Sequence, residues 1–448
     1  MQLYDHQAAA LNATKEFNRV AFYHDMGLGK TYTGAEKMRQ LGGRVNLVIC
    51  QKSKIDDWFD HFEDNYYSSG ADEYIILPHD LTDPDGMDIF KENIKTSGGI
   101  QLVGIINYDL IFRRPELLKM KFDTIMLDES SMIQNETAKR TKAIMKLKTD
   151  NVILLSGTPT GGKYEKLYSQ LKLLGWNISK SQYWTEFIET RSIDMGGFKI
   201  PVVTGYKNIG RLKRKMRQYG CNFLKTDDVF DLPAQTFTDI KINTTKEYKK
   251  FRKDKIVCFG NGMKYDPFEL FGQKYSGAYW DDKTFVGDTT LTQMLYERQL
   301  CGAYNAEKLA AFADIMDSTN DRLIVFYNFN AELDALKTIC EKRQRPFSIV
   351  CGAVKDLDDY KNENDSVTFI QYQAGAMGLN LQKANKIVYY TPPLSSELYE
   401  QSKKRIHRIG QERPCFYYRL ICKNSIEEKI YKTLEMRRDF TEKLFLKG

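Results

Sequence analysis

Short apolar, β-branched runs alternate with longer amphipathic segments over the first ~160 residues of the chain. A helix is expected over residues 53–62, where Ser53 can cap the first turn and Asp56 can answer it three residues later. Strands separated by helices predict a parallel, doubly wound sheet with right-handed crossovers. The expected strands are residues 20–23, 45–50, 74–77, 100–106, 122–127 and 151–155.

The same alternation returns after residue ~305, which predicts a second parallel α/β lobe. The two halves share no visible sequence repeat, so their similarity is architectural. The expected strands are residues 322–327, 347–350, 366–371, 386–390 and 415–421. The expected helices lie near residues 330–343, 395–408 and 425–438.

The middle of the chain has a different pattern. We expect residues 161–225 and 241–305 to be largely helical additions to the two lobes. Basic runs at 211–217 and 246–255 are candidate contacts for a polyanionic partner, but solvated helix surfaces explain them at least as well. They are therefore not included among the predicted site residues.

Composition excludes several classes of protein. A chain of 448 residues suits two or three domains, and 42% hydrophobic with 28% charged residues argues against disorder. The net charge of +7 permits a polyanionic partner without requiring one. The eight cysteines include no C-x-x-C pair, which favours buried reduced thiols over disulfides or zinc. No apolar run reaches the ~18 residues of a membrane helix and no signal peptide is visible, so a soluble protein of a reducing compartment is expected.

A glycine-rich turn follows the first expected strand and opens a helix. Gly27 and Gly29 let backbone N–H groups turn inward around phosphate oxygens, and the helix N-terminus adds positive potential. Lys30 would neutralise the β- and γ-phosphates of a nucleotide, and the Thr31 hydroxyl would ligate Mg²⁺. The full G-x-x-x-x-G-K-S/T pattern fails at its first position, His24, so a structural turn remains the alternative.

A pair of acidic residues closes the apolar run 125–127, at the strand end where ligands bind in open α/β sheets. Asp128 would hold Mg²⁺, and Glu129 would orient and deprotonate an attacking water. Hydroxyls in the turn 156–159 can hydrogen-bond these carboxylates. An ordinary exposed strand end and a plain turn are the competing interpretations.

Two arginines near the end of the chain are three residues apart. On a helix, Arg405 and Arg408 would share one face and could bridge the γ-phosphate and the charge of the transition state. A basic helix surface is the alternative. His407 is expected to pack or form a hydrogen bond rather than to titrate in catalysis.

Together these segments resemble the helicase-like ATPases of superfamily two, specifically the SWI/SNF-type DNA translocases. The resemblance implies two RecA-like lobes: 1–225, with a helical protrusion at 161–225, and 226–448, with a helical insertion at 241–305. It also implies Gln7 as the adenine contact and Gly378 as part of the nucleotide site. The matching segments are 3–7, 25–31, 48–58, 106–108, 223–233, 324–326, 374–381 and 401–411.

The sequence departs from the family pattern at three places. Ser131 stands where a histidine is usual, which we expect to weaken the coupling between hydrolysis and DNA while leaving the magnesium and water roles. Gln51 replaces a usual proline, and residues 392–394 lack the usual tryptophan. Because nothing resembles a chromodomain, a bromodomain or another histone reader, we expect a near-minimal bacterial or bacteriophage form in the cytoplasm of the cell or infected host.

The function implied by the resemblance is ATP-dependent translocation along double-stranded DNA, with ATP and Mg²⁺ as cofactors. Contacts mainly to phosphates would make the affinity independent of DNA sequence. Two alternatives remain: a strand-separating DNA or RNA helicase, and an ATP-gated DNA-binding subunit with little turnover. No membrane association is expected, and the sequence does not indicate its protein partners.

Overall fold

The computed structural model describes residues 2–68, 73–194, 199–259, 283–375 and 379–445. Contacts between residues divide the chain into two units. The first unit is Met1–Phe230 together with Arg437–Gly448, and the second is Asp231–Met436. Each unit contains one large sheet in which every described strand pairing is parallel.

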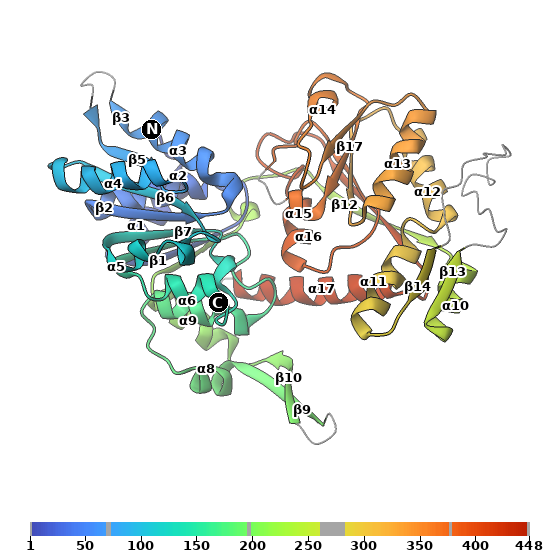
Figure 1. The fold of residues 1–448 in the computed structure, drawn as a ribbon, viewed down its shortest axis with the longest axis horizontal. Coiled ribbons are helices and arrows are strands. Elements are labelled where there is room, and N and C mark those ends of the chain that lie inside the picture. Colours follow the sequence, from blue (N-terminus) through green and yellow to red (C-terminus); the bar gives the residue numbers. More distant parts are fainter. Residues whose placement is uncertain (1, 69–72, 195–198, 260–282, 376–378, 446–448) are drawn as a thin grey trace. The chain divides into compact units, whose positions relative to one another are not determined.

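The first unit is built on a seven-stranded sheet (Figure 1). The predicted strands are present, although two strands, β4 (Glu73–Tyr74) and β5 (Ile76–Asp80), stand where one strand over 74–77 was expected. The predicted fold class, α/β with parallel sheets, is confirmed. In spatial order the strands are β11 (Cys221–Leu224), β1 (Arg19–His24), β8 (Lys148–Leu155), β7 (Lys121–Asp128), β2 (Val45–Cys50), β6 (Gln101–Asn107) and β5 (Ile76–Asp80).

Helices cover both faces of this sheet, because successive strand residues point to opposite sides and both sets are apolar. On β1, Val20 and Phe22 pack into one buried cluster, and Ala21 and Tyr23 pack into the other. The first cluster includes side chains of α1 (Asp5–Ala13), α2 (Lys30–Leu41) and α3 (Ile55–Tyr66). The second includes side chains of α4 (Pro84–Thr96), α5 (Pro115–Lys119), α6 (Lys139–Ile144), α7 (Tyr168–Leu173), α8 (Lys180–Phe187) and α9 (Ile209–Gln218).

The segment 161–225 is less helical than expected. Besides α7, α8 and α9 it contains an antiparallel ribbon of β9 (Ile188–Asp194) and β10 (Lys199–Tyr206), which extends beyond α8 in Figure 1. It also contributes β11, whose Cys221 pairs with Ala21 of β1. The ribbon residues are mostly exposed, so no apolar periodicity marks them in the sequence.

The start of α3 also differs from the prediction. Residues Lys52–Lys54 form a short 3-10 turn that includes Ser53, and α3 begins at Ile55. The N-cap residue is Lys54, without a side-chain hydrogen bond to the helix. The predicted cap at Ser53 is therefore wrong, because the preceding turn closes through Lys54 N–H and the Gln51 carbonyl at 2.9 Å.

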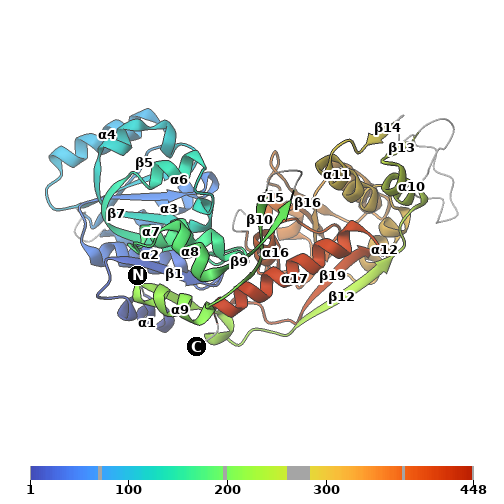
Figure 2. The same ribbon diagram turned by 90° about the horizontal axis from the view of Figure 1, so that it is seen from below.

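The second unit has a six-stranded sheet between two helical layers (Figure 2). In spatial order its strands are β12 (Gln235–Ile242), β19 (Cys415–Cys422), β18 (Lys386–Tyr389), β15 (Leu323–Tyr327), β17 (Val367–Gln371) and β16 (Phe347–Val350). One buried cluster includes side chains of α10 (Lys246–Asp254), α11 (Thr290–Cys301), α12 (Ala306–Asp317) and α13 (Asn330–Lys342). The other includes side chains of α14 (Asp358–Asn362), α15 (Tyr372–Gly375), α16 (Ser396–Lys403) and α17 (Ile426–Phe445).

The segment 241–305, expected to be largely helical, contains two helices among its described residues, α10 and α11. Between them β13 (Ile256–Phe259) and β14 (Lys283–Val286) pair as a second antiparallel ribbon. Residues 260–282 lie outside the described residues. Among the described helices, none combines the length and apolar composition needed to cross a bilayer.

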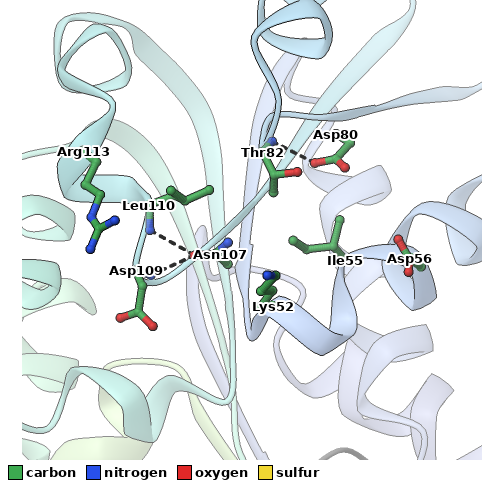
Figure 3. Close-up of a pocket in the computed structure, with 9 residues that line it drawn as sticks. All are labelled: Lys52, Ile55, Asp56, Asp80, Thr82, Asn107, Asp109, Leu110 and Arg113. Atoms are coloured by element: carbon green, nitrogen blue, oxygen red, sulfur yellow. Dashed lines mark hydrogen bonds between the residues drawn. The ribbon is translucent and has the colours of Figure 1, made fainter. Parts of the chain in front are cut away.

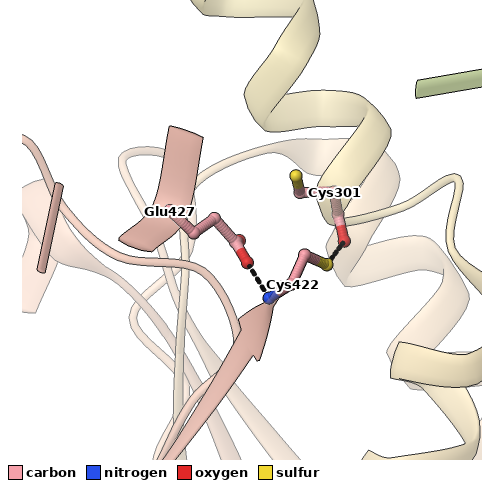
Figure 4. A group of neighbouring side chains, drawn as sticks. All are labelled: Cys301, Cys422 and Glu427. Carbon is pink, nitrogen blue, oxygen red and sulfur yellow. Dashed lines mark hydrogen bonds between the residues drawn. The ribbon is translucent and has the colours of Figure 1, made fainter. Parts of the chain in front are cut away.

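A fully buried ion pair lies within the core of the second unit. Lys308 Nζ on α12 is 2.6 Å from Glu427 Oε1 on α17, and neither side chain is exposed. Burial by itself lowers the pKa of Lys308, but the adjoining carboxylate outweighs it and the net pKa is raised. Cys301 and Cys422 lie beside Glu427, with ligand atoms within 4.8 Å of one another (Figure 4). Because the Lys308 ammonium already supplies the positive charge, this group is a structural core rather than a metal centre.

We predict that Lys308→Met destabilises the chain by about 3–5 kcal/mol, because the Glu427 charge would remain buried without its partner. The measurement is denaturant unfolding. The control is Arg343→Gln, which breaks a half-exposed pair with Asp317 and should cost under ~1 kcal/mol. A loss for Lys308→Met no larger than the control would show that the buried pair contributes nothing specific.

Candidate nucleotide site

The turn between β1 and α2 has the backbone shape of an anion cradle. Gly27 (φ 86°) and Gly29 (φ 67°) both adopt left-handed conformations that L-residues rarely tolerate. Gly29 is the N-cap of α2, so the unpaired N–H groups of the first helical turn and the positive end of the helix dipole are at this loop. The sequence therefore folds here as predicted, although no glycine occupies position 24.

Gln7 holds this loop from the first helix. Its Nε2 donates to the carbonyls of Leu28 at 3.3 Å and Gly29 at 3.2 Å, and its Oε1 accepts the Tyr4 N–H at 3.0 Å. A Cβ on Gly29 would lie 2.2 Å from Gln7 Nε2. The predicted adenine-contacting residue is thus next to the predicted phosphate loop, and the absence of a side chain at 29 allows this approach.

Lys30 is the first residue of α2, and Thr31 is the second. The Lys30 ammonium donates to the carbonyls of His24 at 3.0 Å and Asp25 at 3.1 Å. His24 itself ends β1, where its Nε2 is 2.8 Å from Asn222 Oδ1 and burial lowers its pKa to about 4. His24 is therefore neutral at pH 7 and adds no charge beside the lysine.

The acidic pair ends β7 and is held by two aromatic side chains. Trp58 Nε1 donates to Asp128 Oδ2 at 2.9 Å, and the Tyr108 hydroxyl donates to the Asp128 carbonyl at 2.9 Å. Glu129 has φ 55°, a strained conformation for a non-glycine residue. Trp58 and Tyr108 lie within segments that resemble family motifs, but their contacts with Asp128 depend on tertiary structure.

Two serine hydroxyls donate to the same oxygen of Glu129. Ser156 Oγ is 2.6 Å and Ser131 Oγ is 3.0 Å from Oε1. Burial raises the pKa of the Glu129 carboxyl, and the charge of Lys30 together with the two hydroxyl donors opposes that rise. The bond from Ser156 is the one expected for the turn 156–159. The bond from Ser131 was not expected, because the sequence indicated only a missing histidine.

The donor set fits a nucleotide with Mg²⁺. Asp128 Oδ2 is engaged by Trp58, which leaves Oδ1 as a hard oxygen ligand, and Thr31 supplies a hydroxyl on a partly exposed first helical turn. Thr158 Oγ1 is buried and has no hydrogen-bond partner among the described residues. An unpaired hydroxyl at this strand edge matches the need for one more donor to a phosphate oxygen or a metal-bound water.

The two predicted arginines lie in the second unit, and the predicted helix there is too long. α16 ends at Lys403, so Arg405 and Arg408 lie in turns and do not share a helix face. The helix stops because main-chain groups bond elsewhere: the Arg405 carbonyl accepts the Leu381 N–H at 3.1 Å. The Gln411 Nε2 also donates to the carbonyls of Gln382, Ala384 and Ile406.

The arginine side chains have different surroundings. Arg405 is buried, and its Nη1 is 3.5 Å from the Leu379 carbonyl. Arg408 is half-buried, burial lowers the pKa of its guanidinium, and it has no side-chain hydrogen bond or ion pair with any described residue. A desolvated cation without a partner is suited to receive an anion. His407 Nε2 lies 2.9 Å from the Pro233 carbonyl, as expected for a structural histidine.

One predicted site residue, Gly378, lies outside the described residues. Of the others, the first unit brings together Gln7, Gly27, Gly29, Lys30, Thr31, Asp128 and Glu129. Arg405 and Arg408 belong to the second unit.

A cavity of about 530 Å³ opens beside this site in the first unit, at the carboxyl ends of β2, β5 and β6 (Figure 3). Asn107 shapes its wall, since its Oδ1 accepts the N–H groups of Asp109 and Leu110 at 3.0 Å each. Asp80 Oδ1 likewise accepts the Thr82 N–H at 2.8 Å. Its lining includes both acidic and basic side chains. The lining residues are Lys52, Ile55, Asp56, Asp80, Thr82, Asn107, Asp109, Leu110 and Arg113.

Comparisons with known proteins define the class. The SNF2-related domain model matches residues 6–302, and the helicase conserved C-terminal domain model matches residues 307–410. A parallel α/β unit with a phosphate loop, an acidic pair and a following helicase C-terminal region is the pattern of a helicase-like ATPase. The chain belongs to the SNF2-related family of these proteins.

Its relatives come from eukaryotes and bacteria. The yeast ISWI chromatin-remodeling complex ATPase ISW1 is 24% identical over 93% of this chain and 38% of its own length. The yeast DNA repair and recombination protein RAD26 is 26% identical over 95% of this chain and 40% of its own length. The putative ATP-dependent helicase/translocase YwqA of Bacillus subtilis is 23% identical over 94% of this chain and 46% of its own length. The chain thus spans less than half the length of these relatives.

One solved structure with a similar chain is the Sulfolobus solfataricus SWI2/SNF2 ATPase core in complex with dsDNA. It covers 99% of this chain and 92% of its own, with 19% identity and a TM-score of 0.42. The family assignment rests on the match to the SNF2-related domain over residues 6–302.

We predict that Gly29→Ala lowers nucleotide affinity at least ten-fold, because the new methyl group would displace Gln7 from the loop. The matched control is Gly42→Ala at the other end of α2, where φ is 68° and no atom lies within 4 Å. Both variants should lose about 1–2 kcal/mol of stability from the left-handed backbone. Titration with a fluorescent ATP analogue checks this, and equal affinities in the two variants would contradict it.

Proposed function

We propose that this chain is a DNA-dependent ATPase that translocates along double-stranded DNA without necessarily separating the strands, and so remodels DNA or protein–DNA complexes. The observation that carries the proposal is the convergence on one sheet edge of a phosphate loop, a carboxylate pair and their hydroxyl donors. Family membership over residues 6–302 supports the ATPase chemistry. The chain's relatives include proteins named as a helicase/translocase and as DNA repair proteins.

Different residues of the first unit are proposed to bind different parts of the nucleotide. Gln7 contacts the adenine, and the N–H groups around Gly27 and Gly29 hold the phosphates. Lys30 moves from main-chain carbonyls to the phosphate oxygens. Thr31 and Asp128 would hold Mg²⁺, which would supply positive charge against the phosphate oxygens. Glu129 takes a proton from the attacking water.

The second unit completes the site. Arg408 reaches the γ-phosphate and stabilises the charge of the transition state, and Arg405 supports it by ordering the turn through Leu379. The half-buried guanidinium of Arg408, without a partner among the described residues, supports this role. Gly378 is proposed to contact the nucleotide from the same unit.

DNA contact is coupled to the nucleotide site through β6. Asn107 lines the cavity, and its neighbour Tyr108 bonds the carbonyl of Asp128. A backbone phosphate at the cavity would thereby act on the residue next to Glu129. Lys52 and Arg113 supply positive charges there, beside the carboxyl groups of Asp56, Asp80 and Asp109. Such contacts to phosphates would be independent of DNA sequence.

We keep residues 1–225 as the nucleotide-binding lobe and 226–448 as the C-terminal helicase lobe, with accessory segments at 161–225 and 241–305. The change of contact unit after Phe230 supports a boundary near residue 225, while Arg437–Gly448 groups with the first unit. A cytoplasmic setting in a bacterium or an infected host stays a proposal, supported by the relative from Bacillus subtilis.

The testing experiment compares ATP hydrolysis with duplex DNA, single-stranded DNA and RNA, and then runs triplex displacement beside duplex unwinding. We expect stimulation by duplex DNA and displacement of a third strand without unwinding. Unwinding without triplex displacement would support a strand-separating helicase instead. A chain that binds duplex DNA but shows no stimulated hydrolysis would be an ATP-gated subunit.

We predict that Arg408→Ala lowers kcat by ~10³-fold, as expected for loss of an arginine finger, while ATP binding by the first unit persists. The control is Arg413→Ala, an exposed arginine paired with Asp321 that should change kcat less than two-fold. Lys30→Ala and Glu129→Gln should also remove most turnover and spare DNA binding. Steady-state phosphate release checks all four, and a near-normal rate for Arg408→Ala would show that the site is assigned wrongly.

We predict that Ser131→Ala shifts the acid limb of the kcat–pH profile to higher pH. Glu129 must be ionised to act as a base, so activity is lost as pH falls through its pKa. The Ser131 hydroxyl favours the charged form, and its removal raises that pKa. Near neutral pH, kcat should fall about five-fold, as for one hydrogen bond of ~1 kcal/mol.

The matched control is Ser130→Ala, whose hydroxyl bonds Gln170 instead of Glu129. It should leave the acid limb in place, and Ser131→Thr should restore the wild-type profile. If Ser131→Ala and wild type have the same acid limb, Ser131 does not act through Glu129.

A further inference from the structure

We propose that the exposed face of α10 in the second unit is an additional contact surface for the phosphate backbone of duplex DNA, separate from the nucleotide site and the cavity in the first unit. This inference rests on the proposed function and adds a binding surface to it. The surface consists of Lys246, Lys249, Lys250 and Lys253, which we call the lysine stripe.

The stripe follows from helix geometry. Its positions have the spacing i, i+3, i+4 and i+7, which places all four side chains on one face of a helix. All four residues are exposed. Four like charges at neighbouring positions repel one another and destabilise the helix. Helix stability therefore does not explain why four lysines lie on this face.

The stripe is also unneutralised. None of its four lysines forms a hydrogen bond or ion pair with a described residue. Two residues of the other basic run, on α9, differ in this respect. There Arg211 lies 3.5 Å from Glu186, and Lys213 is buried with its pKa lowered by that burial. Of the two basic runs in the sequence, the one on α10 is therefore better placed to meet an anionic partner.

The opposite face fixes the orientation of the helix. Tyr248 is buried, its hydroxyl donates to Glu297 Oε2 at 3.2 Å, and the Ile426 N–H donates back to it at 2.9 Å. Arg252 Nη1 donates to the Asn424 carbonyl at 2.9 Å. Thr245 caps the first turn through the Tyr248 N–H at 3.1 Å. The lysine stripe is consequently held on a rigid element, and only its flexible side chains need to adapt.

The chemistry of the stripe favours a nucleic-acid backbone over an acidic protein. Seven helical steps span about 10 Å, and B-DNA carries one phosphate per ~3.4 Å of axis on each strand, so the stripe matches about three phosphates. Lysine ammonium groups act as point charges and require no shaped pocket. No aromatic or aliphatic residue stands within the stripe to anchor a protein interface or to stack on a base.

The test is the salt dependence of duplex binding by the full chain. The double variant Lys249→Gln/Lys253→Gln should reduce the slope of log Kobs against log salt by about 1 to 2, because each lost phosphate contact removes ~0.9. The matched control is Lys355→Gln/Lys361→Gln, which removes two exposed lysines elsewhere in the second unit and should leave the slope unchanged.

Hydrolysis separates this proposal from the proposed function. The stripe variant should need several-fold more duplex DNA for half-maximal stimulation and should reach the wild-type kcat when saturated. If stripe and control variants have equal slopes, the stripe does not contact DNA, and an acidic protein partner becomes the better occupant. If the wild-type chain does not bind duplex DNA at all, both the stripe and the proposed function are wrong.

Discussion

The parallel register of β1, β8 and β7 is the constraint on which the site depends. Phe22 of β1 and Asp128 of β7 both pair with Leu155 at the end of β8. The three strands therefore end at one edge, and the residues that follow them must meet there. The phosphate loop follows β1, Glu129 follows β7 and Ser156 follows β8. The 2.6 Å bond between Ser156 and Glu129 is the direct result.

Three buried or half-buried charged groups in this molecule have different surroundings. The Lys308–Glu427 pair is neutralised inside the core and belongs to the fold. Glu129 is held by two hydroxyl donors and the field of Lys30, which keeps a buried carboxylate usable as a base. Arg408 instead has no partner among the described residues, so its desolvation is compensated only when an anion arrives. These three arrangements separate the groups that stabilise the fold from those available for chemistry.

The sequence predicted most strands because each is a short apolar run with turn residues on both sides. It also predicted the phosphate loop, since the positive φ angles at positions 27 and 29 favour glycine there. It overextended the helix at 395–408 because the hydrogen bonds that end α16 come from residues distant in the chain, such as Leu381. The β9–β10 ribbon is mostly exposed and leaves no apolar period. The hydrogen bond from Ser131 to Glu129 could not be predicted from the sequence, because it depends on the conformation of the turn after β7.

The central proposal is that Arg408 of the second unit binds the γ-phosphate of the ATP that the first unit holds. The most direct test is pulsed EPR of a duplex-bound chain with one spin label on each unit, with ADP–beryllium fluoride added or withheld. The account predicts that the analogue shortens and narrows the distance distribution in the wild type but not in Arg408→Ala. An equal shortening in both, or no change in either, would contradict it.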